Sequence, residues 1–189
     1  DSSPSRGLGD VYKRQGPEYA QGWSFNVPTE EFYNSFADGD TRRDATILDI
    51  QAFADQTGSS YTEGYDHTGY FNNKYIPRAG ESGGQIELNY LTNYRIIRYA
   101  DVLLMAAEAL NRGQIDDATA LQYLNQVRAR AFGSSDNNLN VSGSALTDAI
   151  WLERKYELAL EGHRFFDLVR TGQASSTIVG FISGKHEVF

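Results

Sequence analysis

Three glutamates, Glu153, Glu157 and Glu161, recur every four residues near the end of the chain. On a helix this spacing places the three carboxylates on one face. Such a row could hold a metal ion or supply an acid/base pair, as in helix-bundle carboxylate sites. Those sites add a Glu-x-x-His pair, and here His163 follows Glu161 at the wrong spacing. We therefore favour a structural row of ion pairs, neutralised by the interleaved Arg154, Lys155 and Arg164.

The other residue types do not assemble an active site. The three histidines, His67, His163 and His186, are far apart, and none has the spacing of a metal-ligand set. Cysteine is absent, which removes thiol nucleophiles and cysteine-bound zinc. The sequence has no Gly-x-Ser-x-Gly elbow, no phosphate loop and no dinucleotide fingerprint. We predict no enzyme activity, no metal and no cofactor.

Aromatic side chains are frequent in the polar half of the chain, before residue 93. Flat rings beside Asn, Asp and Gln suit a sugar, because its C–H faces pack on rings while its hydroxyls form hydrogen bonds. We predict Trp23, Tyr61 and Tyr65 as ligand-binding residues. The alternative is that these rings pack long loops onto the protein. The set from which they are drawn is Tyr19, Trp23, Phe25, Tyr61, Tyr65, Tyr70, Phe71 and Tyr75.

These residues must be positioned by the elements around them, and the second half of the chain has the periodicity of packed helices. The first predicted helix carries an apolar stripe at intervals of four and three: Ile96, Ala100, Leu103, Ala107 and Leu110. Ile97 and Leu104 add a second stripe, whereas Asp101 and Glu108 fall on the remaining face. Gly113 is predicted to end this helix as a left-handed cap.

A second helix is predicted after a cap at Asp116 or Asp117, and a short connection makes it antiparallel to the first. Its apolar stripe is Ala120, Leu121, Leu124, Val127 and Ala131. The pair has the length of one tetratricopeptide-type unit, roughly 34 residues. After a loop from Phe132 to Gly143, a third helix is predicted from a stripe of Ala149, Leu152, Tyr156 and Ala159. Phe166 would continue that stripe past a break at Gly162.

Residues 16–93 show little sustained helical period. Thr29 to Phe36 is predicted as a helix with a Thr29 cap, because a hydroxyl and two early acids follow Pro28. The run from Asp38 to Arg43 is predicted as a turn, Ala45 to Ile50 as a short strand, and Gln56 to Gly84 as a loop. Residues 1–15 differ in character and are interpreted as a non-native or disordered leader.

Charge and hydropathy exclude two classes of partner. The formal net charge is −8 among 189 residues, and no block of Lys or Arg exceeds two, so we expect no binding to nucleic acid or to an anionic membrane surface. No stretch approaches the roughly 20 apolar residues needed to span a bilayer. A single helical hairpin cannot bury its apolar face alone, so we interpret the chain as a fragment of a longer protein.

Three motifs in the helical half resemble those of the SusD/RagB family. Residues 93–109, NYRIIRYADVLLMAAEA, resemble the family signature RYADVLLMxAEA. Residues 124–131, LNQVRARA, are similar to iNxVRxRA, and residues 153–170 are similar to ERxxELxxEGxRxxDLxR. The resemblance extends from about residue 16 to the end. The chain departs from the family in lacking the lipidated N-terminal cysteine, the earlier repeats and the proline-rich tail.

The resemblance implies a surface lipoprotein of the outer membrane in Bacteroidetes-type bacteria. Such a protein would bind an oligosaccharide, or a peptide in the RagB-like branch, and deliver it to a TonB-dependent, SusC-like transporter. It implies a mainly α fold, with a tetratricopeptide-like helical hairpin, further helices and a long loop-rich, aromatic-rich region. Residues 16–93 would form the ligand face and residues 94–189 the helical scaffold. The membrane would be reached only through a lipid anchor absent from this chain. The competing hypothesis is a helical-repeat module that binds a protein partner.

Overall fold

The computed structural model describes residues 27–61, 63, 67–75 and 93–186. Its contacts divide the chain between Ile96 and Ile97 into two compact units. Within the described residues there are eight helices and one pair of short strands, which confirms the predicted mainly α fold. None of these helices is both long and apolar enough to cross a membrane.

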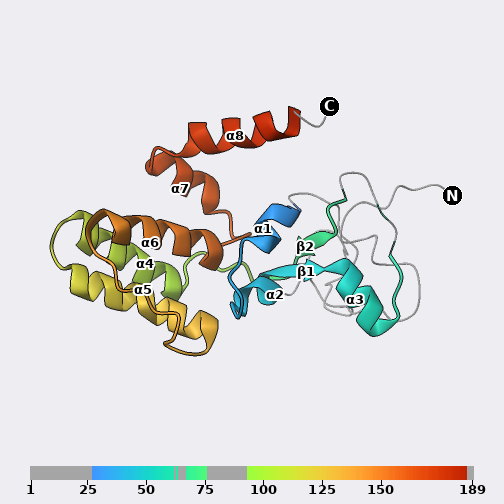
Figure 1. The fold of residues 1–189 in the computed structure, drawn as a ribbon, viewed down its shortest axis with the longest axis horizontal. Coiled ribbons are helices and arrows are strands. Elements are labelled where there is room, and N and C mark those ends of the chain that lie inside the picture. Colours follow the sequence, from blue (N-terminus) through green and yellow to red (C-terminus); the bar gives the residue numbers. More distant parts are fainter. Residues whose placement is uncertain (1–26, 62, 64–66, 76–92, 187–189) are drawn as a thin grey trace. The chain divides into compact units, whose positions relative to one another are not determined.

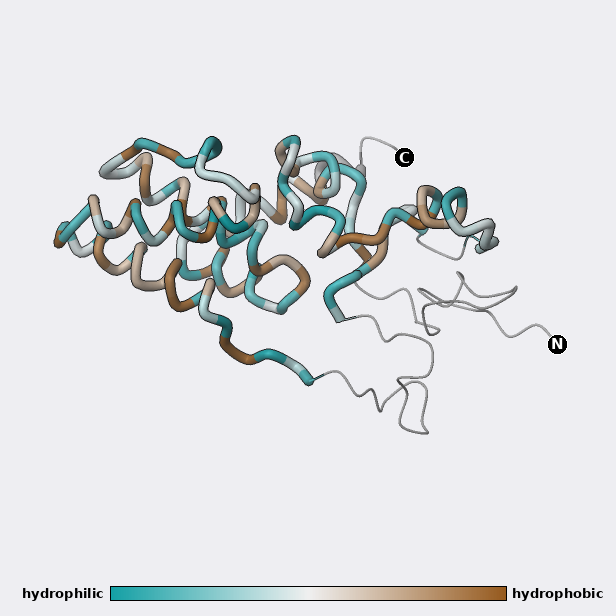
Figure 2. Tube along the Cα trace, turned by 90° about the horizontal axis from the view of Figure 1, so that it is seen from below, coloured by the Kyte–Doolittle hydropathy of each residue, from teal (hydrophilic) through white to brown (hydrophobic). Residues whose placement is uncertain are grey.

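Three helices form the body of the second unit: α4 (Tyr99–Arg112), α5 (Asp117–Phe132) and α6 (Gly143–Glu157). They lie side by side, with α4 and α5 as an antiparallel hairpin (Figure 1), as predicted. The core between them is one cluster from all three helices: Leu103, Leu104, Ala107, Ala120, Leu124, Val127, Leu146 and Ile150. Apolar and polar positions alternate along these helices (Figure 2), as expected when each buries one face.

The start of α5 follows from its predicted cap. The Asp116 carboxylate accepts a hydrogen bond from the backbone N–H of Thr119 at 3.0 Å. The end of α4 differs from the prediction, because Gly113 has a right-handed conformation (φ −73°) and Gln114 is left-handed (φ 54°). A Cβ on Gly113 would lie 2.7 Å from the carbonyl oxygen of Ala109. Glycine is therefore required here for space and not for its backbone angles.

Two predicted apolar stripes were partly wrong. Ile96 and Ile97 precede α4 and are 75% and 66% exposed. In α6, Leu152 is exposed while Glu153 and Arg154 are buried, because the buried face of this helix continues in ion pairs. The buried residues of α6 are Leu146, Ile150, Glu153, Arg154 and Glu157.

The predicted break near Gly162 is confirmed, and two helices follow it. The helix α6 ends at Glu157, and Leu160 and Gly162 both have positive φ angles (62° and 83°). The next helices are α7 (Arg164–Arg170) and α8 (Ala174–His186). Phe166 on α7 is 69% exposed. The prediction that it continues the buried stripe was therefore wrong.

The first unit is built around a two-stranded antiparallel ribbon. Its elements are α1 (Glu30–Asn34), α2 (Arg42–Thr46), β1 (Ile47–Asp49), α3 (Ile50–Thr57) and β2 (Tyr70–Asn72). Leu48 of β1 pairs with Phe71 of β2, and both join Ile50 in a small apolar core. Thr29 caps α1 as predicted, since its hydroxyl accepts from the Phe32 N–H at 3.2 Å.

Parts of this unit differ from the predictions. Arg42 and Arg43 belong to a helix and not to a turn, because Asp40 forms a buried ion pair with Arg42 at 2.6 Å and fixes the start of α2. The predicted strand from Ala45 to Ile50 is limited to Ile47–Asp49. Ile50 begins α3, and β2 lies inside the predicted loop.

Candidate functional site

Of the three predicted ligand-binding residues, Tyr61 is described, whereas Trp23 and Tyr65 lie outside the described residues. The Tyr61 hydroxyl donates a hydrogen bond to the side-chain oxygen of Gln51 at 2.8 Å. Its ring lies parallel to the His67 ring, with centroids 5.5 Å apart and 12° between the planes. Tyr61 also packs against the small core of the first unit. The ring is therefore held in one orientation with its hydroxyl near the surface.

The helix α3 supplies the polar neighbours of Tyr61. Asp49 caps this helix by accepting from the Ala52 N–H at 3.0 Å, so Gln51 lies in the first turn. One turn later, the Asp55 carboxylate accepts a hydrogen bond from the Gln51 side-chain amide at 2.8 Å. Gln51 and Asp55 are both exposed. The result is a continuous polar array, from the Tyr61 hydroxyl through Gln51 to Asp55, on the surface of the first unit.

Sequence reasoning missed Gln51, Asp55 and the helix that carries them. Two signals could have found α3: Asp49 at the N-cap and Gly58 at the C-cap, where the structure has a left-handed φ of 68°. The eight-residue helix between them is too short for a clear apolar stripe, and Ile47 and Leu48 before it favour a strand.

The other described aromatics of the first unit have mixed roles. Phe71 is 2% exposed and belongs to the core, which fits the alternative of rings that pack loops. Tyr70 stacks on Tyr33 with centroids 4.4 Å apart. The Arg43 guanidinium also lies over the Tyr33 ring, 4.9 Å from its centroid, so this ring is already in contact with two side chains. Burial raises the pKa of the Tyr33 hydroxyl.

In the second unit, the row of three glutamates is buried in ion pairs, which confirms the structural interpretation of that row. Arg98 bridges two of them, donating to Glu161 at 2.7 and 2.8 Å and to Glu157 at 2.9 Å. Arg128 donates to Glu153 at 2.7 Å. The hydrogen bonds from Arg98 to Glu161 raise the pKa of the Arg98 guanidinium. Each of the three carboxylates is thus paired with an arginine, as the structural interpretation expects.

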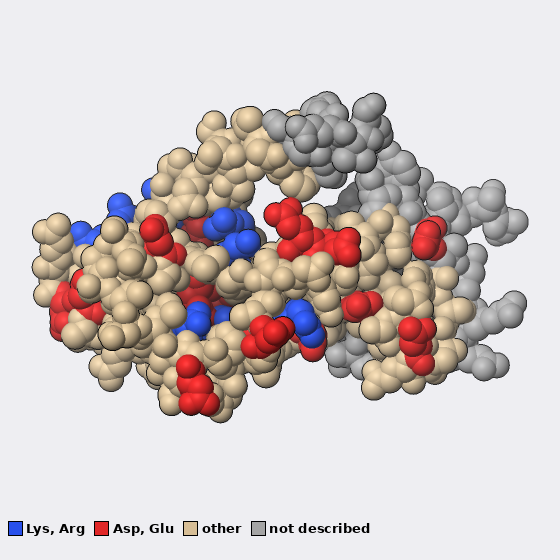
Figure 3. All heavy atoms as spheres, in the orientation of Figure 1, with Lys and Arg blue, Asp and Glu red and all other residues tan. Residues whose placement is uncertain are grey.

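The arginines that neutralise the row differ from those predicted. They come from α5 and the residue before α4, whereas Arg154 pairs with two aspartates, Asp101 at 2.7 Å and Asp167 at 3.0 Å. Both aspartates and Arg154 are buried. Within the described residues, no group of His, Asp and Glu is arranged to hold a metal ion. On the face drawn in Figure 3, described Lys and Arg side chains lie beside Asp and Glu and do not gather into one basic patch.

Glu108 on α4 is a buried carboxylate that three neighbouring side chains hold in its charged form. Burial by itself would raise its pKa, but hydrogen bonds from Arg170, Trp151 and Arg112 outweigh burial and lower the pKa to about 2. The three donors lie 2.6, 3.0 and 3.1 Å from the same carboxylate oxygen. Glu108 faces a surface hollow that the arginines of this network also line. Its charge is balanced within the protein, so the carboxylate stabilises the packing of α4 against α6 and α7.

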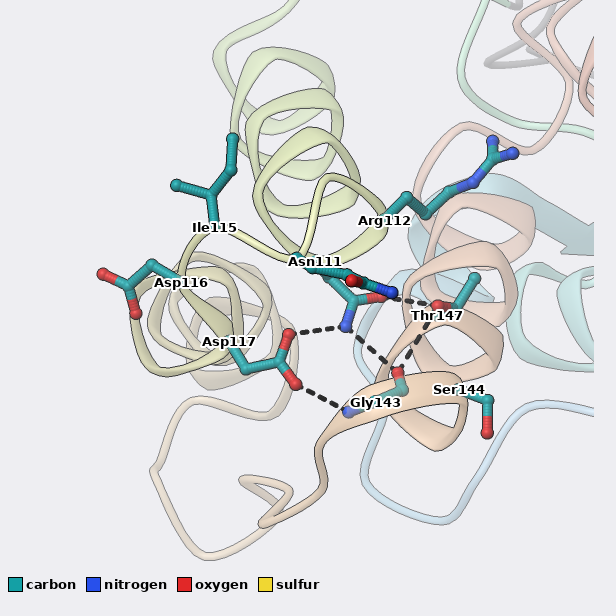
Figure 4. Close-up of a pocket in the computed structure, with 9 residues that line it drawn as sticks. Asn111, Arg112, Ile115, Asp116, Asp117, Gly143, Ser144 and Thr147 are labelled. Carbon is teal, nitrogen blue, oxygen red and sulfur yellow. Dashed lines mark hydrogen bonds between the residues drawn. The ribbon is translucent and has the colours of Figure 1, made fainter.

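A second hollow lies where α4, α5 and α6 meet (Figure 4). At its base the Asn111 amide donates to Asp117 at 2.7 Å and to the Gly143 carbonyl at 3.0 Å. Asp117 also accepts from the Gly143 N–H at 2.6 Å, and Thr147 donates to the Asn111 oxygen. These polar groups satisfy one another and join three helix ends. The hollow is therefore a structural junction, and we do not assign a ligand to it.

Comparison with known proteins places the chain in a family. The family model described as the SusD family matches residues 49–187. SusD-like protein P2 of Formosa agariphila is 37% identical over 169 residues, which cover 81% of this chain and 32% of that protein. The chain thus spans about a third of the length of this relative.

Solved structures give the same result. Surface glycan-binding protein A from Bacteroides thetaiotaomicron, in complex with laminarihexaose, matches with a TM-score of 0.75 and 35% identity over 92% of this chain and 38% of that one. A laminarin-binding SusD-like protein matches with a TM-score of 0.71 and 42% identity, over 87% of this chain and 34% of that one. The chain has the helical hairpin and the buried Arg–Glu row described above, and the SusD family model matches most of its length. The chain therefore belongs to the SusD family.

Proposed function

We propose that this protein binds an oligosaccharide at the surface of the outer membrane and delivers it to a TonB-dependent, SusC-like transporter. The observation that carries the proposal is the similarity, over nearly the whole chain, to a glycan-binding protein solved with laminarihexaose and to a laminarin-binding relative. Because the chain spans only about a third of those proteins, ligand residues outside it would complete the site.

Within this chain, the proposal assigns ligand contact to Trp23, Tyr61 and Tyr65. The surroundings of Tyr61 support its part in it, because a half-buried ring held by stacking presents its hydroxyl beside two exposed polar side chains, Gln51 and Asp55. A ring fixed in this way loses little conformational entropy when a ligand binds. The row of glutamates and the junction at Asn111 serve the scaffold and take no part in binding.

A second candidate function is recognition of a protein or peptide partner, and one observation favours it. Three apolar or aromatic residues on one side of α4 are exposed: Tyr99 at 69%, Val102 at 43% and Met105 at 45%. Their spacing of three residues places them along one stripe of the helix. Exposed apolar stripes on helices are common sites of contact with other polypeptides.

Isothermal titration separates the two functions. The full-length gene product is titrated with laminarihexaose, maltohexaose, xylohexaose and mannohexaose, and with a pool of random peptides. The glycan proposal expects saturable heat with one of the hexasaccharides and none with the peptides. Binding to peptides with no heat from any hexasaccharide would refute it and support the second candidate. Co-purification of the outer-membrane transporter with the tagged protein tests the delivery step, and its absence under conditions that retain the membrane would contradict that step.

A further inference from the structure

The polar array beside Tyr61 has a fixed direction of hydrogen bonding. An ionised carboxylate only accepts hydrogen bonds, so the Gln51 NH₂ group must face Asp55 and the Gln51 oxygen must face Tyr61. The Tyr61 hydroxyl must then donate to Gln51, as the structure has it. This leaves the Tyr61 oxygen able to accept, one Gln51 N–H able to donate, and the second Asp55 oxygen able to accept.

We propose that Tyr61, Gln51 and Asp55 form one subsite for an uncharged sugar unit, an inference that rests on the proposed function above. Each sugar hydroxyl both donates and accepts, so a ligand needs alternating acceptors and donors in fixed positions. The array offers them in the order acceptor, donor, acceptor. It also has the exposure that a ligand requires, since Gln51 and Asp55 are exposed and Tyr61 is half-buried.

The geometry of the array is set before a ligand arrives. Gln51 and Asp55 are one turn apart on α3, whose first turn is capped by Asp49. On the other side, His67 stacks on Tyr61 and meets Phe71 edge-on, with centroids 5.8 Å apart. Phe71 is a core residue of β2, so the position of the Tyr61 ring is tied to the ribbon. Preorganised polar groups bind hydroxyls more tightly than mobile ones, because less ordering is needed on binding.

The charge around the array indicates the class of sugar. Asp55 is the one formally charged member, and it is negative. From Ile47 to Tyr75 the sequence has one residue of the Lys/Arg type, Lys74, and one histidine, His67, against four acidic residues: Asp49, Asp55, Glu63 and Asp66. A uronate or sulfated sugar would bring a like charge against Asp55, and the array contains no cation to offset it. Uncharged sugars carry no such penalty.

The test compares single variants of exposed residues on α3 in the full-length gene product. Gln51→Ala removes the centre of the array, and Gln56→Ala removes the same side chain from another exposed position of the helix. The probes are the neutral hexasaccharide that the parent protein binds and hexagalacturonate, each measured by isothermal titration. Thermal melts confirm that both variants are folded.

We expect Gln51→Ala to weaken binding of the neutral hexasaccharide about fivefold to tenfold, the loss of one or two hydrogen bonds. Gln56→Ala should stay within about twofold of the parent, as substitutions of surface residues away from a site generally do. Hexagalacturonate should bind at least tenfold more weakly than the neutral probe, and Asp55→Asn should narrow that gap.

Equal affinities of Gln51→Ala and Gln56→Ala, with a parent that binds the neutral probe, would overturn the subsite and leave the proposed function standing. Tighter binding of hexagalacturonate by the parent would overturn the assignment to uncharged sugars. A parent that binds no hexasaccharide at all would overturn both the proposed function and the subsite.

Discussion

Replacement of Glu108 by Gln tests the claim that buried ion pairs hold α4 against α6 and α7. The variant keeps the size of the side chain and an oxygen that can accept from Trp151, but it removes the charge that faces Arg170 and Arg112. The fall of the Glu108 pKa from its ordinary 4.5 to about 2 corresponds to about 3 kcal/mol of stability at pH 7. We therefore expect Glu108→Gln to lower the free energy of unfolding by about that amount.

The pH dependence of this loss has a defined sign. Because the pKa of Glu108 is lower in the folded protein than in the unfolded chain, its stabilisation is complete above about pH 4.5 and is lost as the pH falls towards 2. The difference between parent and Glu108→Gln should be about 3 kcal/mol at pH 7 and pH 5, and about 1 kcal/mol at pH 3.

Hydrogen exchange measured by mass spectrometry on peptides from α4 and α6 gives the free energy of opening at each pH. The variant is compared with the parent at the same pH, so that intrinsic exchange rates cancel. Asp148→Asn, which removes an exposed carboxylate from α6, is the control and should change the free energy by less than about 0.5 kcal/mol. A difference for Glu108→Gln that is the same at pH 7 and pH 3, or absent at pH 7, would refute the reasoning.

Three further predictions concern the scaffold and the ligand face. Arg98→Met should destabilise the second unit by about 3–5 kcal/mol, because it removes the cation that pairs with two buried carboxylates, Glu157 and Glu161. Adding Glu161→Gln should recover part of this loss, as measured by urea midpoints in a double-mutant cycle. Gly113→Ala should cost about 1–3 kcal/mol, because the new Cβ meets a backbone oxygen, whereas Gly180→Ala, with open space around it on α8, should be neutral or stabilising; thermal melts compare the two. Trp23→Ala should weaken glycan binding in calorimetry without lowering the melting temperature, and a large fall in that temperature would show instead that Trp23 is part of the core.

The parts of the fold that sequence predicted well are those with local, regular signals. The apolar stripe through Leu103 and Ala107 located α4, and the carboxylate of Asp116 located the start of α5. Thr29 did the same for α1. Periodicity and capping act within a few residues along the chain, so they are visible in one sequence without knowledge of the tertiary packing.

The main errors concern helix faces on which charged side chains are buried. Asp101 and Glu108 were assigned to the outer face of α4, yet both are buried, because arginines from α6 and α7 reach them. A carboxylate is counted as solvent-exposed until a distant partner is known, and Arg154 and Arg170 lie more than 50 residues along the chain from Asp101 and Glu108 respectively. Gly113 shows the same limit, since its close contact with a backbone oxygen is a tertiary detail.

The candidate site was predictable only in outline. The composition of the first half pointed to aromatic side chains beside amides and carboxylates, and Tyr61 was selected on that basis. Its hydrogen bond to Gln51 spans ten residues and depends on the helix α3. The sequence patterns had predicted a strand up to Ile50 and a loop from Gln56, and so did not indicate this helix. The polar members of the array therefore required the structure.

The central claim is that the protein binds a glycan, and calorimetry with the full-length gene product tests it most directly. Titration with neutral hexasaccharides, laminarihexaose among them, should give saturable heat for at least one, with an affinity that Gln51→Ala weakens and Gln56→Ala does not. No heat from any of them, together with saturable binding of peptides, would contradict the account.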